Sequence, residues 1–205
     1  MIYLTHFKTI ALTLMLLVSL KLKAQDTTRL FIFSGVGIIN GLGTFGKSVK
    51  PSLGFNSGLE LKLIGHVFAQ LSIDFNALKY NQQNIDANSS YLFQNTNSTL
   101  LVLGGNIGYN FNKPNTKWSA FTYLGSGYLN IGEPRVTLEK GNTIVQSVVN
   151  QSNIFGRGGV RIGYKTKSSF FQTLYLDTTY WASAAKVQGG NVKGISILIG
   201  TRLTM

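Results

Sequence analysis

Apolar and polar residues alternate along much of this chain. Between positions 67 and 77 every second residue is apolar: Val67, Ala69, Leu71, Ile73, Phe75 and Ala77. The residues between them include a polar set: Gln70, Ser72, Asp74 and Asn76. Because successive side chains of a strand point to opposite faces, this alternation predicts a strand with one apolar and one polar face.

The same alternation occurs in four other segments: 53–63, 101–111, 154–164 and 194–205. Three more segments have the composition of strands without a clear division of faces: 29–38, 118–129 and 170–181. No segment shows an apolar stripe of helical period with capping residues at its ends. The sequence therefore predicts eight strands and no helix.

The predicted connections alternate in length. Three are short: 64–66, 112–117 and 165–168. Four are long and polar: 39–52, 80–98, 131–152 and 184–191. Short turns at one end and long loops at the other are typical of outer-membrane barrels, in which the short turns face the periplasm. Since strands can cross lipid only in a closed sheet, we predict an all-β, eight-stranded antiparallel up-and-down transmembrane β-barrel.

The charged residues of the strands predict which face lines the lumen. Six of them fall off the clearly apolar faces: Glu60, Asp74, Arg157, Arg161, Asp177 and Arg202. On a lipid-facing surface an Arg or Lys would cost about 2–4 kcal/mol at the bilayer midplane. We therefore expect these six to point inward as a structural charge network, and Leu71, Ile73, Ile197 and Ile199 to contact lipid. An eight-stranded lumen is filled by its own side chains, so a conductive pore is not expected.

One pairing inside the barrel can be predicted from residue numbers. A turn centred on Thr166-Lys167 makes the numbers of opposed residues add up to 333 or 334, and a sum of 334 places Arg157 opposite Asp177. Opposed residues lie close enough for contact. The alternative is that Arg157 pairs across the lumen with Glu60 or Asp74.

The N-terminal segment has the features of a secretory signal peptide. Lys8 precedes an apolar run over 10–20, which is too short to span a bilayer as a helix, and Ala24 is a small residue at the expected cleavage position. We predict a signal peptide over 1–24 and one barrel domain over 25–205. Beyond the leader, no apolar run is long enough for a helical span.

Composition and charge narrow the chemistry. The chain has no cysteine, which excludes disulfides and thiolate metal sites, and its net charge is +12. The basic residues are scattered, and several lie near the predicted short turns, so contact with anionic lipid head groups is favoured over nucleic-acid binding. Beyond the leader the one histidine is His66, in the predicted turn 64–66. No catalytic, cofactor or metal site is predicted.

A phosphate-binding pattern occurs at Gly41 to Ser48, which reads GLGTFGKS. It matches the P-loop spacing, in which a helix follows the final Ser or Thr. Here Pro51 follows closely and an alternating strand comes next, so a crossover helix is not expected. We interpret 41–48 as a glycine-rich surface loop in which Lys47 has no role in nucleotide binding.

With this leader, these strands and these connections, the chain resembles the small outer-membrane β-barrel domain proteins of Gram-negative bacteria, the OmpA/OmpX-like type. The junction at the end of the leader, Lys23-Ala24-Gln25, is similar to that of members from the Bacteroidota. The resemblance covers 25–205. It implies a location in the cell outer membrane.

Three function classes agree with these observations. The favoured one is a non-enzymatic barrel with a structural role or a partner-binding role through its long extracellular loops. Its expected partners are outer-membrane lipids, with lipopolysaccharide among the candidates, and a protein that the sequence does not identify. The alternatives are a soluble lipocalin-like carrier of a small apolar ligand, with the faces inverted, and a lipid-modifying barrel enzyme.

Overall fold

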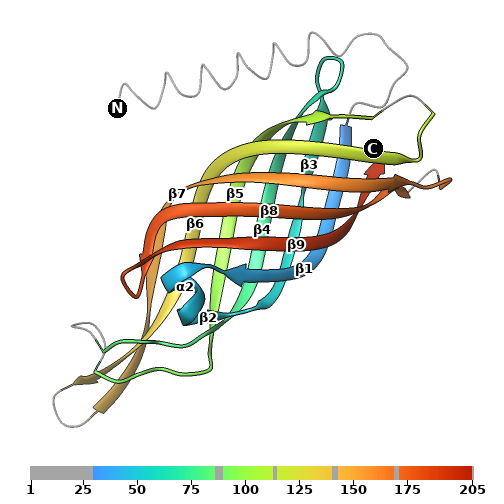
Figure 1. Ribbon diagram of the computed structural model, residues 1–205. Helices are drawn as coiled ribbons and strands as arrows, with labels where there is room; N and C mark the ends of the chain where they lie inside the picture. Colours follow the sequence, from blue (N-terminus) through green and yellow to red (C-terminus); the bar gives the residue numbers. More distant parts are fainter. Residues whose placement is uncertain (1–29, 86–89, 113–114, 140–142, 169–170, 205) are drawn as a thin grey trace, which may run out of the picture.

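The fold is seen in a computed structural model that describes residues 30–85, 90–112, 115–139, 143–168 and 171–204 (Figure 1). The predicted signal peptide 1–24 lies outside the described residues. The long strands are β1 (Leu30–Gly41), β3 (Ser52–Lys62), β4 (Val67–Tyr80), β5 (Thr96–Asn110), β6 (Trp118–Glu139), β7 (Thr143–Lys165), β8 (Phe171–Val187) and β9 (Gly190–Thr204).

These eight strands form one closed antiparallel barrel. Each pairs with the next along the chain, and β1 pairs with β9 from Phe31–Thr204 to Gly41–Gly194. Closure leaves no free edge within the barrel wall, as a sheet that crosses lipid requires. The predicted fold class, an eight-stranded antiparallel up-and-down barrel, is confirmed.

Two short elements lie between β1 and β3. The helix α2 (Gly43–Ser48) makes one turn and a half, and β2 (Val49–Lys50) pairs with the end of β4. The prediction of a loop without a helix over 39–52 was therefore wrong for 43–48. A six-residue helix is too short to show an apolar period, and its Phe45 is buried inside the barrel. No helix follows Ser48, as predicted, because β2 begins there.

Strands β6 and β7 extend well beyond the barrel wall. They remain paired out to Glu139–Thr143, and the hairpin projects at the lower left of Figure 1. The predicted loop 131–152 is therefore mostly strand. On the β7 side of this hairpin most residues are exposed on both faces, so the apolar alternation that marks a strand is lost there.

The prediction of a long loop over 184–191 was also wrong. Strands β8 and β9 continue to a turn at Gln188 and Gly189, whose φ angles are 51° and 75°. A two-residue turn with positive φ at both positions matches the twist of the antiparallel strands that it joins.

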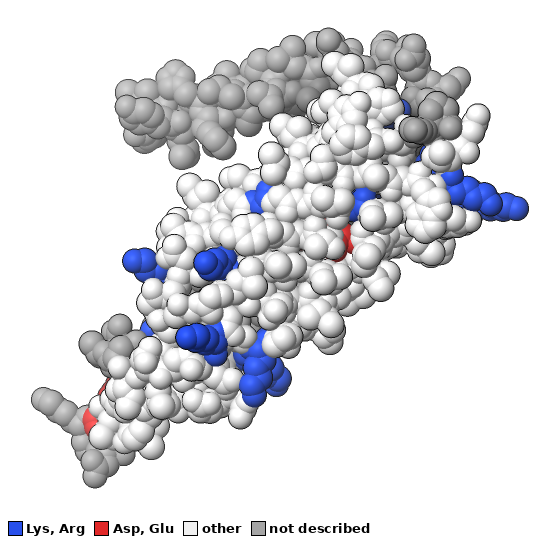
Figure 2. Space-filling view, viewed as in Figure 1, with Lys and Arg blue, Asp and Glu red and all other residues white. Residues whose placement is uncertain are grey.

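The two faces of the barrel wall differ as the alternation predicts. Leu71, Ile73, Ile197 and Ile199 are exposed on the outside, and Figure 2 shows that uncharged residues cover most of the wall. In two of the three strands whose facing the sequence left open, Phe31 and Phe33 of β1 and Phe121 and Tyr123 of β6 are buried inside.

Glycines make room for the large inward side chains. A Cβ at Gly104 would lie 2.9 Å from the Phe155 ring, and one at Gly127 would lie 2.8 Å from it. Both distances are too short for a side chain, so the narrow lumen accommodates Phe155 because its neighbours on β5 and β6 have none.

Candidate functional site: the barrel lumen and its loop end

We distinguish two ends of the barrel. The short-turn end carries the turns β3–β4, β5–β6 and β7–β8. The loop end carries α2, residues 81–85 and 90–95, the projecting β6–β7 hairpin and the β8–β9 turn. The lumen between them has a charged part and an apolar part.

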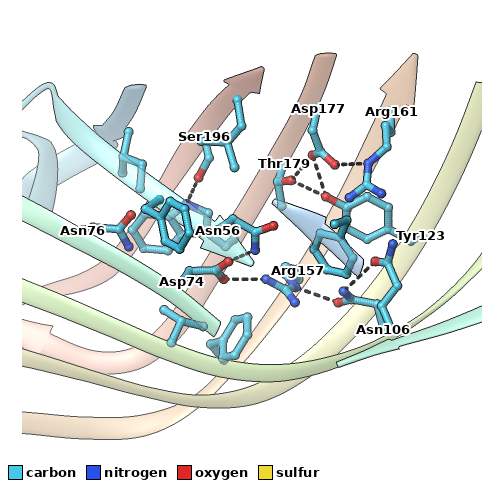
Figure 3. Close-up of a pocket in the computed structure, with 18 of the residues that line it drawn as sticks. Asn56, Asp74, Asn76, Asn106, Tyr123, Arg157, Arg161, Asp177, Thr179 and Ser196 are labelled. Atoms are coloured by element: carbon cyan, nitrogen blue, oxygen red, sulfur yellow. Dashed lines mark hydrogen bonds and ion pairs between the residues drawn. The ribbon is translucent and has the colours of Figure 1, made fainter. Parts of the chain in front are cut away.

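Arg157 on β7 lies at the centre of the charged part (Figure 3). Its Nη1 is 2.6 Å from Asp74 Oδ2, and its Nε donates a hydrogen bond of 2.6 Å to Asn106 Oδ1. Its Nη2 donates to Ser72 Oγ, while Asn56 donates to the other oxygen of Asp74. The guanidinium thus has polar partners on β4 and β5, and the carboxylate has a second donor on β3.

Arg161, four residues further along β7 toward the short-turn end, is paired with Asp177. Arg161 Nε is 2.8 Å from Asp177 Oδ2. The other carboxylate oxygen accepts hydrogen bonds from Tyr123 OH (2.6 Å) and Thr179 Oγ1 (2.8 Å). The guanidinium also lies over the Tyr175 ring, 4.2 Å from its centroid. Arg161 and Asp177 are both buried, so the pair is shielded from water.

Glu60 on β3 connects these two groups to Arg202 on β9. Its Oε1 is 2.8 Å from Arg202 Nη2, and its Oε2 is 3.5 Å from Arg161 Nη1. Gln70 donates to Glu60 Oε2 at 2.8 Å and accepts from Asn106 at 3.1 Å. The result is one connected network in which three carboxylates face three guanidinium groups, so its formal charge is zero.

All six charged residues predicted to point inward lie in this network. The predicted pairing of Arg157 with Asp177, however, was wrong. Opposed residues of β7 and β8 have numbers that add up to 338, so Arg157 lies opposite Trp181 and Asp177 lies opposite Arg161. The alternative partner, Asp74, is the one that Arg157 contacts.

The physical reason is the position of the β7–β8 turn. Lys165 still pairs with Thr173, and the Thr166 N–H donates to the Gln172 carbonyl, so the strands run past the predicted turn at Thr166-Lys167. The register is displaced by an even number of residues. Side chains therefore keep their faces while they change partners.

The part of the lumen near the loop end is apolar. A cluster of buried residues fills it: Ile39, Phe45, Val49, Leu78, Tyr80, Leu100, Val102, Leu129, Ile131, Phe155, Trp181, Ala185, Val187 and Val192. Phe45 of α2 meets Trp181 edge to face, with 6.2 Å between ring centroids. Only about 40 Å³ remains open between this cluster and the charged network, room for one or two waters. The described side chains thus fill the lumen.

A second buried charge pair holds the loop end together. Glu133 and Arg135 form an ion pair at 2.9 Å, and Tyr80 OH donates to Glu133 Oε1 at 2.9 Å. Gln188 of the β8–β9 turn also donates to Glu133, at 3.2 Å, and accepts backbone hydrogen bonds from Gln83 and Asn84. The sequence placed Glu133 in a polar loop, so nothing in its pattern identified it as buried.

One edge of the projecting hairpin is unpaired in the part of the chain that the structure describes. Strand β7 pairs with β8 only from Phe155 onward, so its residues 143–153 have β6 on one side and no strand on the other. The outer edge of β6 is covered, since Ser90 N–H donates to the Val136 carbonyl. The free segment, TIVQSVVNQSN, contains no charged residue and no proline.

The motifs considered for catalysis are separated from one another. His66 lies exposed in the β3–β4 turn, where its ring is 5.5 Å from that of Tyr109, and Lys47 lies exposed on α2 at the other end. Among the described residues no group of three or more His, Cys, Asp or Glu could hold a metal ion. The same residues include no helix that is long and apolar enough to cross a membrane.

Comparison with known proteins places the chain by its fold. No protein-family model matches it, and no curated protein is similar to it in sequence. The crystal structure of Neisserial surface protein A superposes with a TM-score of 0.60 at 9% identity, over 86% of this chain and 97% of that one. Ail of Yersinia pestis gives a TM-score of 0.48 at 11% identity over 86% and 100%. The N-terminal barrel domain of Pseudomonas aeruginosa OprF gives 0.45 at 11% over 86% and 98%.

Closed eight-stranded antiparallel barrels, the architecture of Neisserial surface protein A, are therefore the structural class of this chain. At this level of identity the likeness concerns the fold.

Proposed function

We propose that this protein is a non-enzymatic barrel of the bacterial outer membrane whose loop end binds a protein partner at the cell surface. The apolar outer wall supports the membrane location, because exposed residues such as Leu71, Leu124 and Ile199 encircle a barrel whose charges are inside. Outer-membrane lipids would be its immediate surroundings, with the loop end outside the cell.

The facing of the wall argues against a soluble carrier. A lipocalin-like protein that binds an apolar ligand has an apolar cavity and a polar exterior. Here the exterior is apolar, and ion pairs such as Asp74–Arg157 occupy the lumen. No observation favours the lipid-modifying enzyme, since His66 lies at the short-turn end, away from the loop end.

The free edge of β7 carries the proposal of a protein partner. An exposed strand edge offers a row of unpaired N–H and C=O groups to which an extended segment of another protein can add. Proteins usually protect such edges with lysine, proline or a covering loop. In β7 the segment 143–153 has neither lysine nor proline, and Ile144 and Val148 are exposed on it.

The membrane location can be tested by fractionation of cells that produce the protein. We expect it in the outer-membrane fraction, with a gel mobility that changes on heating as closed barrels unfold. Recovery in the soluble fraction would contradict the proposal.

The partner site can be tested by photocrosslinking in intact cells, with a photoreactive amino acid at Gln146. We expect a discrete adduct that Val148→Lys abolishes, because a lysine on an edge strand opposes strand addition. Leu138→Lys, an exposed position of the same hairpin on the covered strand β6, is the matched control and should keep the adduct. An adduct that survives Val148→Lys, or no adduct at all, would exclude this edge as the site.

A further inference from the structure

A group of lysines surrounds one side of the loop end. We call it the basic rim: Lys47, Lys50, Lys79, Lys186 and Lys193. These residues come from α2, β2, β4, β8 and β9, which lie around the same side of the barrel in the order β4–β3–β1–β9–β8. Figure 2 shows blue side chains gathered at this end, over α2 and β2 and beside the β8–β9 hairpin.

Three rim lysines stand immediately beyond the apolar wall. Lys79 follows the outward Ala77 by two residues, Lys186 follows Ala184, and Lys193 precedes Ile195 by the same interval. Residues two apart on a strand share a face, so each lysine occupies the next outward position after the apolar belt. Lys50 lies opposite Lys79 in the β2–β4 ladder and is also exposed. The ammonium groups therefore lie where lipid head groups would meet the barrel.

The rim lysines have no carboxylate partner among the described residues. Of the described acidic residues, only Glu139 is exposed, and it lies at the tip of the hairpin. Lys50 and Lys79 instead donate to side-chain amides, to Asn95 and Asn97 at 2.9 Å each. No described carboxylate therefore neutralises the positive charge of the rim.

The rim does not continue over β5, β6 and β7. At the level of Lys186, β6 and β7 present Asn130 and Ser152 outward, and these bond to each other at 2.6 Å. A girdle that merely anchors a barrel in any anionic bilayer would surround it. A one-sided set of lysines flanked by amides is better suited to a particular head group.

We propose that the basic rim binds the phosphate groups of a phosphorylated glycolipid in the outer leaflet, lipid A of lipopolysaccharide. This inference rests on the outer-membrane location proposed above and names the lipid at that site. Lysine ammonium groups are effective phosphate ligands. The acyl chains of the same molecule would lie against the apolar belt below the rim, on Ile195 and Ala77, while the Asn95 and Asn97 amides would face its sugars.

The test uses the folded protein in nanodiscs of zwitterionic lipid. Binding of purified bisphosphorylated lipid A is titrated by native mass spectrometry, beside fully dephosphorylated lipid A and phosphatidylglycerol. The rim variant replaces Lys50, Lys79, Lys186 and Lys193 by Gln. The matched control replaces Lys62, Lys117, Lys165 and Lys167 at the short-turn end by Gln, so that both proteins lose the same charge.

We expect the rim variant to bind lipid A at least about tenfold more weakly than the wild type, because each of the four lysines that it lacks contributes to the attraction of an anionic head group. The control variant should bind within about twofold of the wild type. Dephosphorylated lipid A and phosphatidylglycerol should bind the wild type weakly and the rim variant no differently.

Equal binding of lipid A to the rim variant and the wild type would overturn the inference. So would equal binding of dephosphorylated lipid A, or binding of a soluble sulfated polysaccharide in place of lipid A. Fractionation of the same variants separates the two proposals. If the protein is in the outer membrane but does not prefer lipid A, only the proposal of lipid A binding is refuted. If the protein is soluble, the proposed membrane location is refuted.

Discussion

At the scale of single residues, the lumen is held together by charges that water hardly reaches. Arg157 has three polar partners, and Asp177 has three donors from Arg161, Tyr123 and Thr179. Buried ion pairs contribute little net stability compared with apolar packing, but removing one partner leaves an unmatched charge. The stability of the barrel therefore depends on each of the six charges keeping a partner of opposite sign.

Replacing Asp74 by Asn should lower the free energy of unfolding by about 3 kcal/mol, because Arg157 would keep its charge without a counterion. Urea unfolding of the refolded barrel, followed by its heat-dependent gel mobility, measures this. Glu139→Gln, which removes an exposed carboxylate, should change stability by less than about 0.5 kcal/mol. Adding Arg157→Gln to Asp74→Asn should recover part of the loss. Equal stability of Asp74→Asn and wild type would contradict the buried pair.

The partner of Asp177 can be measured by double-mutant cycles. Asp177→Asn combined with Arg161→Gln should show a coupling of about 1 kcal/mol or more, whereas the cycle with Arg157→Gln should be additive within about 0.5 kcal/mol. Reversal of these two couplings would support the register in which Arg157 lies opposite Asp177.

Sequence reasoning predicted the direction of these side chains better than their partners. Whether Arg157 points inward depends on parity, which survives any register change by an even number. Which carboxylate it meets depends on the exact turn and on strands across the lumen, such as β4 with Asp74. The alternation within one strand contains no information about which residues of other strands lie across the lumen.

At the scale of elements, α2 acts as a plug at the loop end. Its six residues could not form a stable helix alone, since isolated helices shorter than about 12 residues are marginal. Burial of Phe45 against Trp181 supplies the missing stability, and that contact joins elements far apart in sequence. The helix was therefore invisible in the local pattern of 39–52.

Phe45→Ala should lower the free energy of unfolding by about 3 kcal/mol, the usual effect of removing a buried aromatic ring. The control Phe111→Ala removes an exposed ring at the short-turn end and should change it by less than about 1 kcal/mol in detergent. Urea titrations at fixed detergent concentration compare the two variants. Similar losses in both would mean that Phe45 does not pack inside the barrel.

At the scale of the whole molecule, the lumen is closed twice, by the charged network and by the apolar cluster. The strand number and closure were predictable because an apolar outer wall around a polar lumen requires alternation along each strand. The length of the projecting hairpin was not predictable, because residues such as Ser147 and Asn150 are exposed to solvent, where no apolar face is required.

Purified protein in planar bilayers should show no stable conductance of porin size, because side chains fill the lumen. A known porin reconstituted in the same bilayers gives the reference current. Reproducible porin-sized steps from this protein would mean that the lumen opens in the membrane.

The Arg202–Glu60 contact also affects how the barrel is completed. Arg202 on β9 reaches past β1 to Glu60 on β3, so the pair spans the seam where the last strand meets the first. In an unclosed sheet Arg202 lies on the last strand and Glu60 on the second strand from the other edge, so the two charges cannot meet. Opening the seam inside a bilayer would separate them where charges attract strongly. Pairing of β9 with β1 therefore also neutralises these two charges, and reopening a barrel that has closed in lipid is unfavourable.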